Sequence, residues 1–228
     1  MGSEGWHTGR NRTRGRTQMS LTTEVPAGEA YAAGIPDADE PYGLFEAWFA
    51  EAAAREPNDP NAMCLATCSP DGWPSARMVL LKGRDDRGFV FYTNEHSRKG
   101  GELLANPRAA LCFHWKSMRR QIRIEGEVER VTAGESDAYF ASRSRGSRIS
   151  AVSSDQSRPL ASRAEFERRV AETEARYPGE DVPRPAHWGG FRLLPRMIEF
   201  WQDMPFRMHD RLVFERAGEG WTTWRLFP

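Results

Sequence analysis

The feature that most constrains the fold of this chain is a succession of short apolar segments, each bounded by a tight turn. Residues Ala62 to Cys68 and Ser75 to Lys82 flank Ser69-Pro70-Asp71-Gly72, where proline presets one turn angle and glycine tolerates a positive one. This arrangement predicts a β-hairpin. A second turn, Asp85-Asp86-Arg87-Gly88, precedes a further strand over Phe89 to Thr93. This part of the chain therefore favours antiparallel β-structure.

Strands later in the chain repeat the pattern. They are expected over Ala109 to Trp115, Gln121 to Val131, Trp188 to Leu193, Ile198 to Trp201, Leu212 to Arg216 and Trp221 to Leu226. In the second of these, Ile122, Ile124, Gly126 and Val128 alternate and so share one face. Many antiparallel strands with short turns favour a small barrel over a parallel βαβ sheet. We therefore predict a mainly β fold with peripheral helices (α+β).

Helices are predicted around these strands. Apolar residues recur at helical spacing in the alanine-rich stretch from Tyr42 to Arg55, which Pro57 ends. The others follow Ser97, which can cap a helix to about Ala105, and the capping boxes Thr132-x-x-Glu135 and Ser162-x-x-Glu165. Between the last two helices we expect a polar connecting segment from Ser142 to Arg163.

Charge and apolar content limit the functional classes to which this chain can belong. Lysine plus arginine and aspartate plus glutamate both number 32, so no net field attracts nucleic acid or an anionic membrane. No apolar run approaches the roughly 20 residues of a membrane span, and no signal-peptide pattern opens the chain. Cys64, Cys68 and Cys112 form no CxxC pair, which is typical of reduced thiols. We therefore expect a cytoplasmic protein with no nucleic-acid and no membrane partner.

Residues 1–41 are expected to form a disordered or extended N-terminal arm, followed by one domain over residues 42–228. Met1 to Gln18 carries four arginines and the single acid Glu4. A basic nucleic-acid arm is one interpretation, and a disordered tail, an expression remnant or a misplaced start before Met19 is the favoured one. Residues 19–41 are rich in Gly, Ala, Pro and acids without a period, which indicates an extended arm.

Cations at strand and helix ends are the strongest sign of chemistry. Arg77 and Lys82 lie five residues apart, so on an ideal strand they point to opposite faces and can serve two different anions. Ser97-Arg98-Lys99 opens a predicted helix whose free N–H groups favour a phosphate. Each cation alone is better explained as solvated surface charge. Taken together they predict phosphate binding, although no glycine-rich phosphate loop is present.

Separate sequence blocks resemble the signature of the pyridoxamine 5'-phosphate oxidase family, in order and at compatible spacing. They are Arg77-Met-Val-Leu-Leu-Lys82, Phe91-Tyr92-Thr93-Asn94, Ser97-Arg98-Lys99, Arg120-Gln121, Gln156-Ser157, Trp188-Gly-Gly-Phe-Arg192, Glu199-Phe-Trp201-Gln202 and Arg207-Met-His209-Asp-Arg211. The resemblance covers roughly residues 42–228, including the terminal Arg225-Leu-Phe-Pro228. A match spread over so many blocks is specific, whereas any one block would be weak.

The resemblance implies an FMN-binding split β-barrel that forms a homodimer, with FMN in two clefts at the subunit interface. It assigns cofactor binding to Arg77, Met78, Val79, Leu80, Leu81, Lys82, Tyr92, Thr93, Arg98, Lys99, Gln121, Gln156, Ser157, Trp201 and Arg211. This assignment is chemically sensible, because arginine forks and a lysine charge neutralise a phosphate while hydroxyl and amide groups satisfy its remaining acceptors.

The resemblance also implies a substrate site made of Lys82, Tyr139, Arg143, Ser147, Arg207, Met208 and His209. Tyr139, Arg143 and Ser147 step by four, so a helix would place all three on one face and form a phosphate site. An amphipathic helix with an exposed arginine is the alternative interpretation.

The catalytic pair implied by the family is Arg207 and His209, which point the same way if their segment is extended. In that arrangement Arg207 packs on the substrate and orients it against the flavin N5, and His209 hydrogen-bonds near the reacting substituent. No general base is assigned. The remaining histidines form no ligand set, so no metal is predicted.

The implied reaction is FMN-dependent oxidation of pyridoxamine 5'-phosphate and pyridoxine 5'-phosphate to pyridoxal 5'-phosphate, with O2 reduced to H2O2. Two departures from the family are noted. Gly28 stands three residues before Tyr31, where the family often carries an arginine that covers the bound substrate, so the arm lacks this side chain for closing the site. Pro205 and Phe206 could reshape the mouth of the site. The alternatives are a split-barrel flavoprotein acting on another substrate and a non-catalytic FMN-binding protein.

Overall fold

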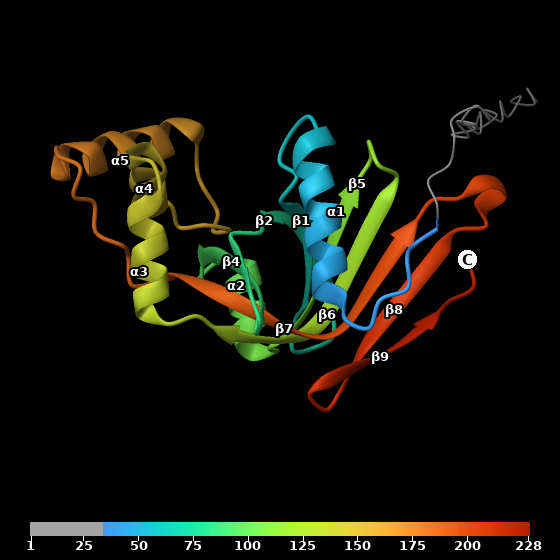
Figure 1. Cartoon of the computed structure of the whole chain (residues 1–228). Helices are drawn as coiled ribbons and strands as arrows, with labels where there is room; N and C mark the ends of the chain where they lie inside the picture. Colours follow the sequence, from blue (N-terminus) through green and yellow to red (C-terminus); the bar gives the residue numbers. More distant parts are fainter. Residues whose placement is uncertain (1–33) are drawn as a thin grey trace, which may run out of the picture. The chain divides into compact units, whose positions relative to one another are not determined.

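The computed structural model describes residues 34–228, so Gly28, Tyr31 and the rest of the predicted arm before residue 34 lie outside the described residues. Nine strands form one antiparallel sheet in the order β2-β1-β5-β6-β7-β4-β3, with β8 beside β7 and β9 beside β8 (Figure 1). The strands are β1 (Ala62–Cys68), β2 (Pro74–Leu80), β3 (Gly83–Asp85), β4 (Gly88–Asn94), β5 (Arg108–Trp115), β6 (Arg120–Arg130), β7 (Trp188–Gln202), β8 (Asp210–Ala217) and β9 (Gly220–Arg225). The predicted fold class, mainly β with peripheral helices, is confirmed.

The helices in the described part are α1 (Pro41–Arg55), α2 (Arg98–Ala105), α3 (Ala133–Ser142), α4 (Arg145–Ser153) and α5 (Arg163–Arg176). The predicted N-caps are present, but Ser162 accepts from the Glu165 N–H without the reciprocal bond that would complete its predicted capping box. Ser97 accepts from the Gly100 N–H, and Thr132 and Glu135 form the capping box of α3. These side chains satisfy backbone donors of the first helical turn, which explains why the helices begin there. Among residues 34–228, none of the helices is both long and apolar enough to cross a membrane.

The segment predicted as a polar connection, residues 142–163, contains helix α4. Ser144 begins this helix, because its hydroxyl accepts from the Ser147 N–H. Arg143 precedes it in an extended conformation (φ −75°, ψ 151°) and ends α3. The prediction that Tyr139, Arg143 and Ser147 share one helical face is therefore wrong, since two helices meet between Arg143 and Ser144.

Strand β7 joins two strands that the sequence predicts separately. Its first part pairs with β4 and its second part with β8, while β6 runs beside both. The β6–β7 register shifts between Glu125 and Gly126, next to Pro195. Proline has no N–H to donate to the neighbouring strand, and a bulge tolerates this missing hydrogen bond. A Cβ at Gly126 would lie 1.9 Å from the Leu194 carbonyl oxygen, so glycine is required there. The bulge lets one long strand serve both parts of the sheet.

The core lies between α1 and the sheet. Phe45 of α1 packs edge-on against Phe89 of β4 and Phe113 of β5, with ring centroids 5.0 and 5.7 Å apart. Trp48 packs against Phe200 of β7 at 5.2 Å. All five side chains are buried. Burial of one aromatic face of α1 accounts for the helical spacing of apolar residues in the sequence.

Residues 34–40 have no regular secondary structure, yet they are bound to β8 and β9. Ile35 is buried in the core, and its N–H donates to Asp210 at 2.7 Å. Arg225 of β9 donates to the Ile35 carbonyl oxygen and pairs with Asp37, both at 2.8 Å. These contacts tie the chain entering α1 to the C-terminal hairpin.

Candidate active site

A pocket of about 350 Å³ opens where the ends of β2 and β4 meet α2, α3, α4 and the start of β7. Its lining includes these residues predicted to bind cofactor or substrate: Met78, Val79, Leu80, Lys82, Tyr92, Thr93, Lys99, Tyr139, Arg143 and Gln156. The lining also includes residues that the sequence analysis did not assign: Asn94, Ser150, Ala151, Ser154 and Trp188. Asn94 and Trp188 belong to the matching sequence blocks, which was the available signal, whereas the other three belong to α4 or follow it.

One wall of the pocket is a set of nearly parallel aromatic rings. Tyr92 stacks on Tyr139 with centroids 4.1 Å apart and on Trp188 with centroids 5.5 Å apart. Gly190 of β7 makes room for this arrangement, because a Cβ there would lie 2.6 Å from the Tyr92 ring and 2.7 Å from Val131. A flat aromatic wall of this kind is suited to a planar ring ligand.

Arg143 lies over the Trp188 ring with its guanidinium carbon 4.9 Å from the ring centroid. Its Nη1 is buried and has no hydrogen-bond partner among the described residues. Burial lowers the pKa of Arg143, although Tyr139 opposes the shift, and an arginine stays protonated in proteins. A buried guanidinium nitrogen without an acceptor is costly, so this position is suited to an anionic ligand.

Lys99 is buried at the start of α2, and its Nζ donates to Thr93 Oγ1 and Gln156 Oε1, each at 3.2 Å. Burial, and then the charge of Arg77, lowers the pKa of Lys99. Lys82 follows β2 and is exposed to the pocket. Among the residues that the structure describes, neither lysine pairs with a carboxylate. The pocket therefore carries positive charge that residues 34–228 do not neutralise.

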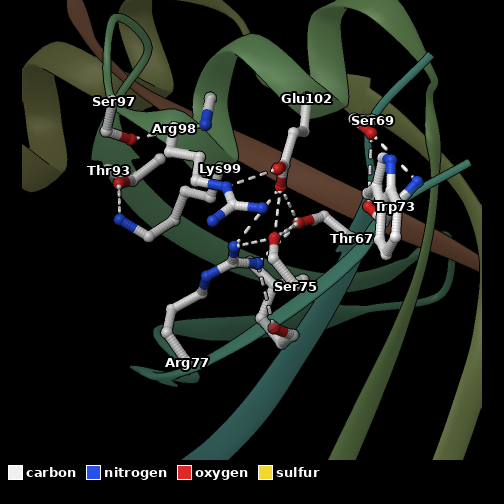
Figure 2. A network of polar contacts seen from close by, with 12 residues as sticks. Thr67, Ser69, Trp73, Ser75, Arg77, Thr93, Ser97, Arg98, Lys99 and Glu102 are labelled. Atoms are coloured by element: carbon white, nitrogen blue, oxygen red, sulfur yellow. Dashed lines mark hydrogen bonds and ion pairs between the residues drawn. The ribbon is translucent and has the colours of Figure 1, made fainter. Parts of the chain in front are cut away.

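Two further predicted cofactor residues, Arg77 and Arg98, do not line this pocket but converge on the buried Glu102 of α2 (Figure 2). Glu102 Oε2 accepts from Ser75 at 2.6 Å, from Arg77 Nη2 at 3.3 Å, and from Thr67. Glu102 Oε1 accepts from Arg98 Nε at 2.8 Å. We call these five residues the Glu102 cluster.

Glu102 is charged at neutral pH. Burial alone raises the pKa of its carboxyl group, but hydrogen bonds from Ser75, Thr67 and Arg98, together with the charge of Arg98, outweigh burial and lower it from 4.5 to about 2. In the described part of the chain, Arg77 and Arg98 form ion pairs with Glu102 alone. The cluster thus joins β1, β2 and α2 through one carboxylate.

Most of the remaining predicted residues gather in a second place, at the ends of β7 and β8. Trp201 lies across from Gln121 of β6 and Arg211 of β8 in the strand register. Its ring centroid is 4.6 Å from that of His209. Arg211 pairs with the buried Glu199 at 2.7 Å. We call the predicted residues at this place the β7–β8 cluster: Gln121, Trp201, Arg207, Met208, His209 and Arg211. None of them lines the pocket described above.

The backbone of the β7–β8 cluster differs from the prediction. Pro205 begins a short 3-10 turn, and Phe206 and Arg207 take positive φ angles of 55° and 61°. Arg207 is therefore not extended, so the condition under which Arg207 and His209 would point the same way is not met. His209 Nδ1 lies 2.9 Å from Asp203 Oδ1 and 3.3 Å from the Met204 N–H. The turn leaves Phe206 and Met208 largely exposed, at 88 % and 62 %.

Three predicted residues lie outside the pocket, the Glu102 cluster and the β7–β8 cluster. Leu81 is buried in the hydrophobic core, so its side chain does not reach the pocket. Ser147 lies in the first turn of α4, where its N–H and hydroxyl both bond to Ser144. Ser157 lines a separate depression together with Arg98.

Two protein-family models match the chain. Residues 49–177 match the model described as pyridoxamine 5'-phosphate oxidase, which includes most of the pocket lining. Residues 188–228 match the model described as the pyridoxine 5'-phosphate oxidase C-terminal dimerisation region. This second region includes β7 to β9 and most of the β7–β8 cluster.

Individual proteins agree with the family matches. A pyridoxine/pyridoxamine 5'-phosphate oxidase from Gluconobacter oxydans is 63 % identical over 189 residues, covering 83 % of this chain and 94 % of that protein. The protein of the same name from Hyphomonas neptunium is 60 % identical over 216 residues, covering 92 % and 99 %.

Solved structures share the fold. PhzG from Burkholderia lata, solved in complex with tetrahydrophenazine-1-carboxylic acid, has a TM-score of 0.79 at 35 % identity, covering 84 % of this chain and 94 % of that one. An FMN-binding protein related to pyridoxamine 5'-phosphate oxidase, from Nostoc punctiforme, has a TM-score of 0.66 at 18 % identity, covering 81 % and 97 %.

Proposed function

This chain belongs to the pyridoxamine 5'-phosphate oxidase family, and from that premise we propose that it oxidises pyridoxamine 5'-phosphate and pyridoxine 5'-phosphate to pyridoxal 5'-phosphate, with FMN as cofactor. In this proposal O2 is the terminal oxidant and is reduced to H2O2. The relatives that carry the name of this activity are about as long as this chain and match it over most of their length.

The observation that carries the proposal is the uncompensated positive charge of the pocket. Arg143 presents a buried nitrogen without an acceptor, and Lys82 and Lys99 pair with no carboxylate among the described residues. Cations in such a setting favour a dianionic ligand, and both FMN and the proposed substrate carry a phosphate. The parallel rings of Tyr92 and Tyr139 lie in the same lining and suit a planar partner.

The residues present fit FMN. Lys99, with Thr93 and Gln156, offers a cation, a hydroxyl group and an amide within one hydrogen-bonded group at the start of α2. Arg77 and Arg98 add two guanidinium groups nearby (Figure 2). A phosphate monoester needs charge and several donors, and this set supplies both. Met78, Val79 and Leu80 add the edge strand that lines the same pocket.

Lys82 and Arg143 fit the second phosphate, that of the substrate. The two are far apart in sequence but line one pocket, which Tyr139 of α3 also lines. Arg143 can offer a fork of two N–H donors, and Lys82 is a mobile point charge. Ser147, which the resemblance also assigns to this phosphate, does not line the pocket of the described chain, so in our proposal it acts through the turn that holds Arg143.

A homodimer accounts for the separation of the pocket from the β7–β8 cluster. The β7–β8 cluster lies in the region that matches the family's dimerisation model, and it lines no part of its own chain's pocket. We therefore place Arg207, His209, Trp201 and Arg211 of the partner subunit over the pocket of the first subunit. Exposed Phe206 and Met208 beside them support this arrangement, since exposed apolar groups mark interfaces.

Bound FMN would supply the hydride acceptor and pass the electrons on to O2. The chain's own residues bind and orient. Lys82 and Arg143 hold the substrate phosphate, the aromatic wall limits the position of the rings, and Arg207 and His209 close over the pyridine ring. Two phosphates held at separate places keep donor and acceptor in register, which is the main source of rate enhancement in this proposal. With the amine substrate, hydrolysis of the resulting imine gives the aldehyde and ammonia.

An aerobic assay of the FMN-loaded protein with pyridoxine 5'-phosphate tests the proposal. The aldehyde product and H2O2 should form in equal amounts, and the double substitution Arg207→Ala and His209→Ala should abolish both while FMN stays bound. A yellow protein that forms no product from either the alcohol or the amine substrate would overturn the proposed activity. It would then favour a flavoprotein with another substrate, or one that binds FMN without catalysis.

A further inference from the structure

Glu102 is the one charged member of the Glu102 cluster to which the proposed function gives no role. It is a buried carboxylate at the place where Arg77, Arg98 and Lys99 gather (Figure 2). A negative charge beside a phosphate site opposes phosphate binding by itself. Glu102 must therefore favour phosphate binding in some other way that offsets this repulsion.

The hydrogen bonds of Glu102 indicate what that effect is. Both carboxylate oxygens accept, Oε2 from Thr67, Ser75 and Arg77, and Oε1 from Arg98. Arg98 is otherwise a largely exposed side chain on the first turn of α2, with 61 % of its surface accessible. A long free side chain loses rotamer freedom when it binds a ligand, so an arginine that is already held loses less.

The charges around Glu102 also match the ligand. Arg77 and Arg98 pair with this single carboxylate, and Lys99, whose pKa the charge of Arg77 lowers, lies beside Arg98 in the first turn of α2, so the four side chains together carry two net positive charges. A phosphate monoester carries about two negative charges at neutral pH. Glu102 can therefore hold both arginines while the site keeps a net positive charge.

Resting on the FMN-dependent activity proposed above, we propose that Glu102 is a positioning residue that holds Arg77 and Arg98 in the orientation in which they, with Lys99, receive the FMN phosphate. Glu102 acts through the two arginines and does not touch the flavin. Its effect is therefore specific for the phosphate: it changes the affinity for FMN and leaves the affinity for riboflavin, which lacks the phosphate, unchanged.

The test measures dissociation constants for FMN and for riboflavin by quenching of flavin fluorescence, on the full chain freed of flavin. Glu102→Gln replaces one acceptor oxygen by an amide donor that faces other donors. It should weaken FMN binding by about tenfold or more and leave riboflavin binding within about twofold. Ser75→Ala removes one donor without changing the charge and should act in the same direction, but less. Glu167→Gln, in an exposed ion pair with Arg163 on α5, is the matched control and should change neither constant.

The outcomes separate the inference from the proposed function. Equal weakening of FMN and riboflavin would make Glu102 merely structural, and unchanged or tighter FMN binding would exclude the positioning role; either result overturns the inference. Wild-type protein that binds FMN no better than riboflavin would overturn the proposed phosphate site, and this inference with it. If Glu102→Gln does not fold, as judged by thermal unfolding, the FMN-to-riboflavin ratio of Ser75→Ala decides by the same criterion.

Discussion

Arg192 donates to the Glu135 carboxylate across 2.7 Å and so ties the first turn of α3 to β7. Glu135 also accepts from the Thr132 N–H as part of the capping box. Arg192 is 2 % exposed and pairs in addition with Asp85 and Glu129. Since α3 carries Tyr139 and ends at Arg143, this contact links the sheet to the side chains of the pocket.

Arg192→Lys should loosen this link. Arg192 uses Nη1 for Glu129 and Nη2 for Asp85 and Glu135, and a lysine keeps the charge but ends in a single nitrogen that cannot replace both. We expect a loss of about 1–3 kcal/mol in the free energy of unfolding and a raised KM for the phosphorylated substrate. Urea denaturation and steady-state kinetics measure the two effects. Arg196→Lys on the same strand, 67 % exposed, is the control, and equal behaviour of both variants would refute the link.

The succession of strands and caps could be read from the sequence because the signals are local. The Ser69-Pro70-Asp71-Gly72 turn predicts the β1–β2 hairpin, and Ser97 predicts the start of α2; both are confirmed. Helix α4 could not be read in this way, because its only buried apolar side chain is Ile149 and its cap, Ser144, resembles any polar loop residue. The three-residue β3 is too short to show a period.

The candidate site could be predicted only in part, for a different reason. Tyr92, Lys99 and Arg143 share the pocket, as the resemblance implies, although they come from three separate elements. The geometry of Arg143 could not be predicted, since it depends on the break between α3 and α4. In the function proposed above, the relation between the pocket and the β7–β8 cluster depends on a second subunit, which no local pattern within one chain describes.

Arg143 should discriminate substrates by their phosphate. Arg143→Ala removes the fork, and we expect the KM for pyridoxine 5'-phosphate to rise by about 10- to 100-fold, as for the loss of a charge-assisted hydrogen bond. Arg143→Lys should recover only part of this loss, because the stacking on Trp188 disappears with the planar group. Steady-state kinetics with both variants, and with Arg163→Ala as an exposed control, measures the effect. An unchanged KM would remove Arg143 from the substrate site.

Acid should destabilise the protein through Glu102. Its pKa lies at about 2 in the folded chain and at 4.5 ordinarily, so its contribution is complete above pH 4.5 and is lost as the pH falls towards 2. A shift of this size corresponds to roughly 3 kcal/mol. The free energy of unfolding, measured by urea at several pH values in that window, should fall less steeply for Glu102→Gln than for the wild type. Identical slopes would contradict the lowered pKa of Glu102.

Gly190→Ala should disturb the aromatic wall without changing any charge. The added Cβ would lie 2.6 Å from the Tyr92 ring and 2.7 Å from Val131, so Tyr92 must move and its stack with Tyr139 must open. We expect the variant to fold but to bind FMN more weakly, by about tenfold. Gly134→Ala, at a position on α3 with no atom close to the added Cβ, is the control. Normal FMN affinity in Gly190→Ala would show that the wall does not contact the flavin.

Subunit mixing tests whether one active site draws on two chains. Arg143→Ala damages the pocket and Arg207→Ala damages the β7–β8 cluster, so each homodimer should be nearly inactive. If the cluster of one subunit covers the pocket of the other, a mixed dimer has one site with both defects and one site with none. Random pairing of equal amounts should then restore about one quarter of the wild-type activity.

The alternative arrangement gives a different result from the same mixture. If the pocket and the β7–β8 cluster of a single chain formed the site, every chain would carry one defect and mixing would restore no activity. Unmixed variants at the same total concentration give the baseline, and size-exclusion chromatography shows whether mixed dimers form. Recovery of activity would therefore assign Arg207 to the partner's site, because the two intact halves then reside on different chains.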